Sequence, residues 1–168
     1  MWTGGIQAPH IIQAATDTDF ELEVKFESPV KAPQYQEQGI LIKQDDFNFL
    51  RFEIYSTNAS TFALAAILES ATNSLPLGSN IPHNQSIAAL NIAPLYMRIS
   101  RVGNLWTQSY STDGINFTIV GTAFSHSLTV TGVGIYGGNA TGGSSPAFTA
   151  QVDYFENVLE NPITNEDN

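Results

Sequence analysis

Apolar and charged residues alternate one by one along several short stretches of this chain. The clearest stretch is residues 20–27, with the sequence FELEVKFE, and residues 50–55 and 95–100 repeat the pattern. Successive side chains of a β-strand point to opposite faces, so this alternation gives each strand one apolar and one polar face. The pattern predicts antiparallel sheets that bury one face and expose the other to water.

Shorter stretches rich in β-branched and aromatic residues predict the remaining strands. They lie at residues 38–43, 62–68, 105–110, 117–120, 130–136 and 147–158. Residues 70–94 are mostly polar and contain three prolines, which predicts a short edge strand and a long loop. About ten short strands with almost no helix signal predict an all-β fold, a two-sheet antiparallel jelly-roll β-sandwich.

Turn-forming residues separate the predicted strands. Asp113-Gly114 is a strong hairpin dipeptide because both residues tolerate positive φ, and Val102-Gly103-Asn104 predicts another tight hairpin. We expect the Asp113 side chain to stabilise its turn by accepting hydrogen bonds from backbone N–H groups. Residues 137–146 are rich in glycine and predict a flexible loop.

The length and composition fit one domain. The chain has 168 residues, of which 42% are hydrophobic and none is cysteine. We expect one sandwich at residues 1–160 and an acidic, linker-like tail at residues 161–168. No apolar run approaches the ~18 residues of a membrane span, and no signal peptide is visible at the N-terminus. The abrupt start predicts a module that is covalently linked to neighbouring domains of a longer protein.

The charge of the chain narrows its partners. Sixteen acidic residues against six Lys and Arg give a net charge of −10. Nucleic acids and anionic membranes are therefore excluded as partners, because phosphate binding needs clustered basic residues. The lack of cysteine excludes a disulfide framework, a thiolate nucleophile and a cysteine zinc site.

Several motifs in order resemble one known family. Residues 38–42 (QGILI) and 46–51 (DFNFLR) resemble the signature of DUF1349-like domains, which are concanavalin A-like sandwiches similar to the C-terminal sandwich of family 43 glycoside hydrolases. Further agreement lies at residues 97–104 (MRISRVGN), 110–117 (YSTDGINF), 133–136 (VGIY) and 153–155 (DYF). The resemblance covers roughly residues 4–158. It implies an accessory module of polysaccharide-degrading or cell-surface proteins.

Scarce charges on polar strand faces are the first candidate site. Arg51 and Glu53 share the polar face of one predicted strand, and Arg98 has a matching position on another. If these strands belong to one sheet, the three side chains share a surface, where they could hold vicinal sugar hydroxyls through bidentate hydrogen bonds. The alternative is a cross-strand ion pair that only keeps the sheet soluble.

Aromatic rings are the second signal of sugar binding, because a sugar packs its C–H face on a ring. By alternation, four tyrosines fall on polar faces: Tyr35, Tyr55, Tyr96 and Tyr136. Tyr136 is the best candidate, since it precedes Gly137-Gly138. Trp106 is either a core residue or a ligand platform.

Our first hypothesis is a non-catalytic carbohydrate-binding module of a larger extracellular or cell-surface protein, secreted by a bacterium. It binds a polysaccharide or another glycan on the concave sheet or its rim loops, through Gln38, Arg51, Glu53, Arg98 and Tyr136. The alternatives are a structural or adhesive spacer module and a glycoside hydrolase. We predict no enzymatic activity, because the three histidines lie on separate segments and no catalytic motif is present.

Calcium is the predicted cofactor. The resemblance to jelly-roll carbohydrate modules implies a structural Ca²⁺ held by an acidic residue of the last strand, a position that Asp153 occupies. Calcium takes six to eight oxygen ligands, many of them from loops. The alternative ligands are acidic residues at strand ends, namely Asp17, Asp19, Asp45 and Asp46.

Overall fold

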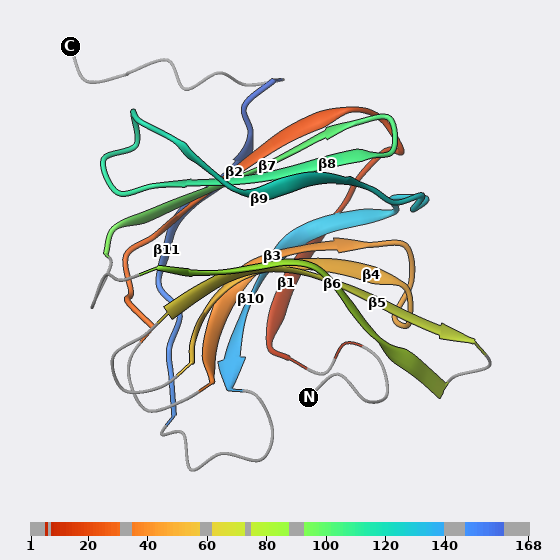
Figure 1. Ribbon diagram of the computed structural model, residues 1–168, viewed down its shortest axis with the longest axis horizontal. Helices are drawn as coiled ribbons and strands as arrows, with labels where there is room; N and C mark the ends of the chain where they lie inside the picture. Colours follow the sequence, from red (N-terminus) through yellow and green to blue (C-terminus); the bar gives the residue numbers. More distant parts are fainter. Residues whose placement is uncertain are drawn as a thin grey trace.

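Two antiparallel β-sheets pack face to face in this protein (Figure 1). The computed structural model describes residues 6, 8–30, 35–57, 62–72, 75–87, 93–139 and 147–159. Within them the chain forms eleven strands and no helix: β1 (His10–Ala14), β2 (Phe20–Phe26), β3 (Gln36–Lys43), β4 (Phe49–Ser56), β5 (Phe62–Thr72), β6 (Leu75–Ile87), β7 (Leu95–Val102), β8 (Leu105–Ser111), β9 (Thr118–Ser125), β10 (Gly132–Asn139) and β11 (Val152–Asn157). The predicted all-β sandwich is confirmed.

The strand order places distant segments side by side. The six-stranded sheet has the order β1-β10-β3-β4-β5-β6, and the five-stranded sheet has the order β11-β2-β7-β8-β9. The first strand thus pairs with β10, and the last strand pairs with β2. This jelly-roll arrangement leaves β1 and β11 at sheet edges on the same side of the sandwich, as Figure 1 shows.

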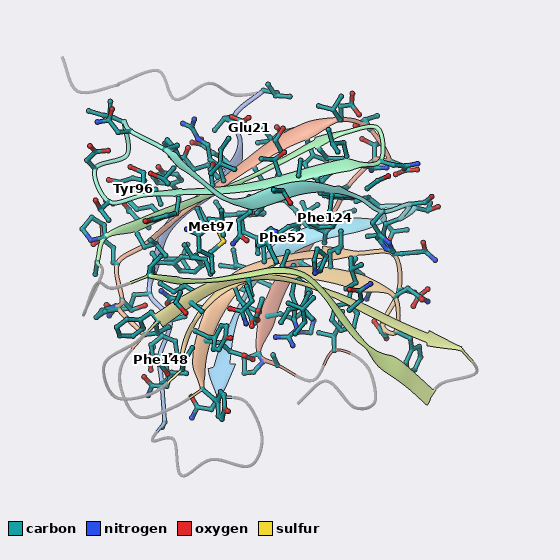
Figure 2. The ribbon with its side chains drawn as sticks, in the orientation of Figure 1. Glu21, Phe52, Tyr96, Met97, Phe124 and Phe148 are labelled. Carbon is teal, nitrogen blue, oxygen red and sulfur yellow. The ribbon has the colours of Figure 1, made fainter. Side chains whose placement is uncertain are left out.

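The alternating stretches bury their apolar faces between the sheets. In β4, Leu50, Phe52 and Ile54 are at most 1% exposed, and β2 and β7 contribute matching apolar rows. Figure 2 shows Phe52, Met97 and Phe124 in this layer between the sheets. Each such burial contributes about 1.5–3 kcal/mol to folding, so the two-residue period is sufficient to fix which face of each strand points inward.

Trp106 belongs to this core. Its side chain is fully buried, and its ring lies 6.0 Å from the Phe20 ring and 6.2 Å from the Phe52 ring. The indole Nε1 donates to the backbone oxygen of His126 at 2.8 Å, which satisfies its one polar atom. Trp106 is therefore a core residue and not a ligand platform.

A buried arginine ties the loops at one end of the sandwich together. Arg101 donates from Nη1 to Asp17 at 2.6 Å, from Nη2 to the backbone oxygen of Leu128 at 3.2 Å and from Nε to the backbone oxygen of Gly103 at 2.9 Å. The same Asp17 oxygen accepts the backbone N–H of Val130, so the pKa of Asp17 is lowered by these bonds. This arrangement explains why an arginine replaces an apolar residue on the inward face of β7.

The β8–β9 turn confirms the role predicted for Asp113. Its Oδ1 accepts the backbone N–H groups of Ile115 and Asn116, each at 2.8 Å, and the Ser111 hydroxyl at 2.7 Å. These bonds hold the pKa of Asp113 well below its usual range. Gly114 has φ of 72° and Gly103, in the β7–β8 turn, has φ of 58°, a conformation that favours glycine.

Several strand boundaries differ from the prediction. The strand β1 was not predicted, and β6 is a continuous 13-residue edge strand where a short strand and a long loop were expected. The last strand is shorter than expected, since β11 begins at Val152, and residues 137–139 belong to β10 and not to a loop. The predicted tail at residues 161–168 lies outside the described residues.

Candidate functional site

The outer face of the six-stranded sheet points away from the core. On this face three of the predicted site residues come together, namely Arg51, Glu53 and Tyr136. Tyr136 of β10 pairs with Gly39 of β3, and Gly39 pairs with Glu53 of β4. Because Gly39 has no side chain, the Tyr136 side chain crosses β3, and its hydroxyl donates a hydrogen bond to Glu53 Oε2. A Cβ on Gly39 would lie 2.1 Å from the backbone oxygen of Phe52, so only glycine fits there.

Arg51 completes this network, which we call the Arg51 triad (Arg51, Glu53 and Tyr136). Its Nη1 donates to Glu53 Oε2 at 2.5 Å and lies 3.6 Å from a carboxylate oxygen of Glu37. The triad is buried, with exposed fractions of 7%, 2% and 3% for its three members in that order. Burial and the charge of Glu53 raise the pKa of Tyr136 well above its usual value, so the phenol stays protonated and acts as the donor.

Accessible polar and aromatic groups lie beside the Arg51 triad on the same face. Tyr55 pairs with Glu37, and its hydroxyl accepts a hydrogen bond from Asn84 Nδ2 at 2.6 Å. Tyr35 precedes β3, is 37% exposed, and donates its backbone N–H to Ser56 O at 2.7 Å. Burial is the largest cause of the raised pKa of Tyr55, and the neighbouring Glu53 and Tyr35 raise it further. We call Tyr35, Tyr55 and Asn84 the tyrosine rim.

The sequence indicated two of the three residues of the tyrosine rim. Alternation placed Tyr35 and Tyr55 on polar faces, but it missed Asn84, because residues 70–94 did not reveal that β6 continues through this position. Asn84 pairs with Ala65 of β5, whose outward side chain is small, and β5 pairs with β4. The signal that could have found Asn84 is its neighbour His83, whose side chain is buried and points inward. The next side chain along a strand points to the opposite face, so Asn84 points outward.

Arg98 lies on the opposite side of the molecule. It belongs to β7 of the five-stranded sheet, so the prediction that it shares a surface with Arg51 is wrong. Its Nε donates to Glu23 Oε2, and the Tyr154 hydroxyl donates to Glu23 Oε1 at 2.5 Å. This second network is the Arg98 triad (Arg98, Glu23 and Tyr154), and its Glu23 is only 2% exposed.

Gln38 faces the interior and not the outer face. It has the same position in the two-residue period as Ile40 and Ile42, which are core residues, and it is fully buried. Its Oε1 accepts from the Ser28 hydroxyl at 2.9 Å, and its Nε2 donates to the Ser28 backbone oxygen at 2.7 Å. These bonds satisfy a buried amide, so Gln38 stabilises the interior and is separated from Arg51 by the sheet.

Asp153 and the other acidic residues considered for calcium take part in local interactions. Asp153 lies at an irregularity of β11 and forms an ion pair with Lys25 at 2.8 Å. Asp17 binds Arg101, Asp19 accepts the backbone N–H of Gly103 at 2.7 Å, and Asp46 pairs with Lys43 at 2.5 Å. In the described part of the chain, no three acidic or histidine side chains come together as a metal site. Calcium binding stays a prediction.

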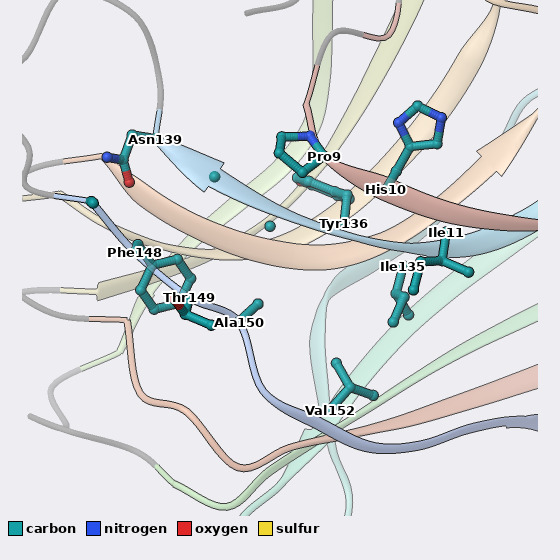
Figure 3. A pocket seen from close by; sticks show the side chains of 13 residues that line it. Pro9, His10, Ile11, Ile135, Tyr136, Asn139, Phe148, Thr149, Ala150 and Val152 are labelled. Carbon is teal, nitrogen blue, oxygen red and sulfur yellow. The ribbon is translucent and has the colours of Figure 1, made fainter.

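A cavity of about 660 Å³ lies at the open side of the sandwich, where the β1 and β10 edge faces the segment that leads into β11. Figure 3 shows Phe148, Ala150 and Val152 on one side of it, opposite Ile11 and Ile135. Gly137 allows this approach, because a Cβ there would lie 2.7 Å from the Cβ of Ala150. The lining is mainly apolar, so the cavity offers few groups for a polar ligand.

Comparison of the sequence with known families identifies the chain. Residues 6–157 match the family described as "Protein of unknown function (DUF1349)". The chain belongs to this family. The match covers the whole described sandwich and confirms the resemblance that the ordered motifs indicated. No curated protein matches the chain, and no described helix is long and apolar enough to cross a membrane.

Solved structures with the same fold include sugar-related proteins. The GH43 BlXynB protein from Bacillus licheniformis has a TM-score of 0.70 at 15% identity, over 94% of this chain and 32% of that chain. A legume lectin-like domain from Entamoeba histolytica has a TM-score of 0.61 at 12% identity, over 92% and 81%. The carbohydrate-binding module CBM66 from Bacillus subtilis has a TM-score of 0.53 at 8% identity, over 79% and 86%. The DUF1349 chain thus shares its fold with these proteins, and it spans only about a third of the GH43 protein.

Proposed function

We propose that this DUF1349 chain is a non-catalytic carbohydrate-binding module of a larger extracellular protein, and that its glycan contacts the tyrosine rim. The observation that carries the proposal is the exposed ring of Tyr35 beside the Asn84–Tyr55 hydrogen bond, on the outer face of the six-stranded sheet. A lectin-like domain and CBM66 share the fold, which supports the same class of ligand.

The chemistry of the rim suits a sugar. The Tyr35 ring provides an apolar surface for the C–H face of a pyranose. One N–H of the exposed Asn84 amide orients the Tyr55 hydroxyl, which leaves the other N–H and the amide oxygen for a ligand. Groups that are held in place before binding lose less conformational entropy when the ligand arrives, so this pair favours affinity.

The Arg51 triad supports the rim instead of contacting the ligand. Arg51, Glu53 and Tyr136 are buried and bonded to one another, so a sugar does not reach their polar atoms without rearrangement. Glu37, the neighbour of Arg51, pairs across the sheet with Tyr55. The triad therefore fixes the strands on which the rim residues stand.

A glycan array followed by affinity electrophoresis of the whole chain tests the proposal. We expect binding to at least one plant, algal or microbial polysaccharide, and a loss of about tenfold or more in affinity for Tyr35→Ala and for Asn84→Ala. Asn104→Ala, in the exposed β7–β8 turn, is the matched control and should bind as the wild type does. An array without any ligand contradicts the function, whereas full binding by both rim variants contradicts only its location.

A further inference from the structure

The outer face of the five-stranded sheet differs from a plain solvated sheet surface in its apolar content. Phe117 lies beneath the Arg98 guanidinium, with 3.8 Å between the guanidinium carbon and the ring centroid. Ile119 is 61% exposed and stands in the same cross-strand row, because Arg98 pairs with Ser109 and Ser109 pairs with Ile119. This part of the sheet thus presents an apolar strip beside a positioned guanidinium.

A tyrosine extends this strip along β7. Tyr96 lies two residues before Arg98 on the same face, and Gly114 is close to its ring, since a Cβ on Gly114 would lie 3.0 Å from two ring carbons. Lys25 Nζ lies 5.9 Å from the centre of the same ring. Figure 2 shows Tyr96 on the five-stranded sheet, away from the core residue Met97. The face therefore carries the rings of Phe117 and Tyr96 in addition to Tyr154 of the Arg98 triad.

The charges on this face decide which ligands it accepts. Two cations stand among five acidic side chains, the cations being Lys25 and Arg98 and the acids being Glu21, Glu23, Glu27, Asp153 and Glu156. Both cations are already paired, Lys25 with Glu27 and Asp153 and Arg98 with Glu23. An anionic ligand would be repelled by the remaining negative charge, so uronate, sulfate and phosphate groups do not suit this surface.

Glu156 is a further acidic side chain of this face, and one of its oxygens is buried. It pairs with Glu23 across the β2–β11 ladder, and its Oε1 is buried without a hydrogen-bond partner among the described residues. Burial is the largest cause of the raised pKa of Glu156, and the charge of Glu23 raises it further. The negative charge of Glu156 is thus already disfavoured beside Glu23, and a neutral ligand adds no further charge there.

We infer that the outer face of the five-stranded sheet is a second glycan-binding surface, specific for a neutral sugar chain. Ile119 and Tyr96 pack against the C–H faces of the sugar, and Arg98, which the Phe117 ring holds in place, bonds its hydroxyls. The class of ligand rests on the proposed function, but the location does not, because no residue is shared with the tyrosine rim. Two surfaces on opposite faces enable one chain to hold two glycan strands at once, which gains avidity on a polymer.

Isothermal titration of the whole chain with neutral oligosaccharides, namely cellohexaose, xylohexaose and mannohexaose, tests this inference. We expect two ligands per chain for at least one probe, and one ligand per chain for Phe117→Ala and for Arg98→Ala. Tyr35→Ala should also retain one ligand, and Tyr35→Ala combined with Arg98→Ala should bind none. Leu105 is an exposed apolar residue at the start of β8, so Leu105→Ala is the matched control for Phe117→Ala and should retain both sites.

Each outcome separates the two surfaces. A single site that Tyr35→Ala abolishes, and that Phe117→Ala and Arg98→Ala leave unchanged, overturns the second surface and keeps the first. A single site that is lost with Arg98→Ala alone supports the second surface and overturns the rim. Absence of binding to any neutral probe, with binding to an acidic glycan on the array, overturns only the second surface. Near-UV circular dichroism of Phe117→Ala and Arg98→Ala verifies that both variants are folded.

Discussion

The two outer faces of the sandwich carry the same three residue types in different surroundings. The Arg51 triad on the six-stranded sheet and the Arg98 triad on the five-stranded sheet each join an arginine and a tyrosine to one glutamate. The side chain of Arg51 is 9% exposed, whereas that of Arg98 is 33% exposed. The same bonds therefore serve as a rigid internal support on one face and as part of an accessible surface on the other.

The energetic consequence of this difference follows from solvation. A buried ion pair that loses one partner leaves a charge without compensation, whereas water replaces the partner at an exposed site. We thus expect stability to depend mainly on the Arg51 triad and ligand binding to depend mainly on groups that water reaches. Changes to matched residues of the two triads can test this division.

The largest contrast is expected between the two arginines. Arg51→Ala removes a cation that contacts the buried carboxylates of Glu53 and Glu37 and should lower the free energy of unfolding by about 3–5 kcal/mol. Arg98→Ala should cost less, about 1–2 kcal/mol, because Glu23 retains the Tyr154 hydroxyl and removal of the partly exposed Arg98 side chain admits water to the carboxylate. Urea unfolding of both variants measures the difference, and equal losses would contradict the division between the two faces.

Gly39 is a further difference between the two triads. It permits the Tyr136–Glu53 contact in the Arg51 triad, and the Arg98 triad has no equivalent glycine. Gly39→Ala forces a Cβ against the backbone oxygen of Phe52 and should cost about 3 kcal/mol. Gly103→Ala is the control: it has open space around it but a φ of 58°, so about 1 kcal/mol is expected. Thermal unfolding ranks the two, and the reverse order would show that backbone conformation outweighs the close approach.

The tyrosine hydroxyls provide a smaller test. Tyr136→Phe removes one hydrogen bond to the buried Glu53 carboxylate and should cost about 1–3 kcal/mol. Tyr154→Phe removes the equivalent bond to Glu23, but its site is more accessible, so a loss below about 1 kcal/mol is expected. Denaturant titration of the two variants side by side distinguishes them, provided that their m-values agree with that of the wild type.

The smallest expected effect is pH-dependent and belongs to the accessible face. Because the folded state raises the pKa of Glu156 above its ordinary value of 4.5, the folded protein binds this proton more tightly than the unfolded chain does. Ionisation therefore costs stability as the pH rises through this range. Glu156→Gln should raise the Tm by about 2 °C at pH 7. Near pH 3.5 the Glu156 side chain of the wild type is protonated and as neutral as Gln, so the Tm should be unchanged there. A gain of equal size at both pH values would contradict this cause.

Local patterns in the sequence were sufficient for much of this fold. Strands such as β2, β4 and β7 alternate strictly, and the Asp113 turn depends on side chains within three residues of one another. The edge strands β1 and β6 were harder, because their sequences lack strict alternation and β6 contains Pro76 and Pro82. An edge strand pairs on one side only and tolerates prolines such as Pro82, so it lacks the alternation of a half-buried strand.

Prediction of the candidate site needed to know which strands pair, and neighbouring residues in the sequence do not show this. Alternation indicated the outward position of Arg51 and Arg98, but the assignment of β4 and β7 to different sheets is a long-range property. Gln38 was a different failure, because its place in the two-residue period, shared with Ile40, already indicated an inward side chain. The rim residue Asn84 could not be found without knowing that β6 pairs with β5.

The pairing of the first and last strands with remote partners sets the order of events during synthesis. Ile11 of β1 pairs with Ile135, and Phe155 of β11 pairs with Val24. Neither sheet can be completed until these late segments have left the ribosome, so β1 waits without its partner strand and β2 waits with one unpaired edge. Such non-local pairing places folding in the range of milliseconds to seconds. During that interval the nascent chain exposes strand edges to other chains, and aggregation competes with closure of the sandwich.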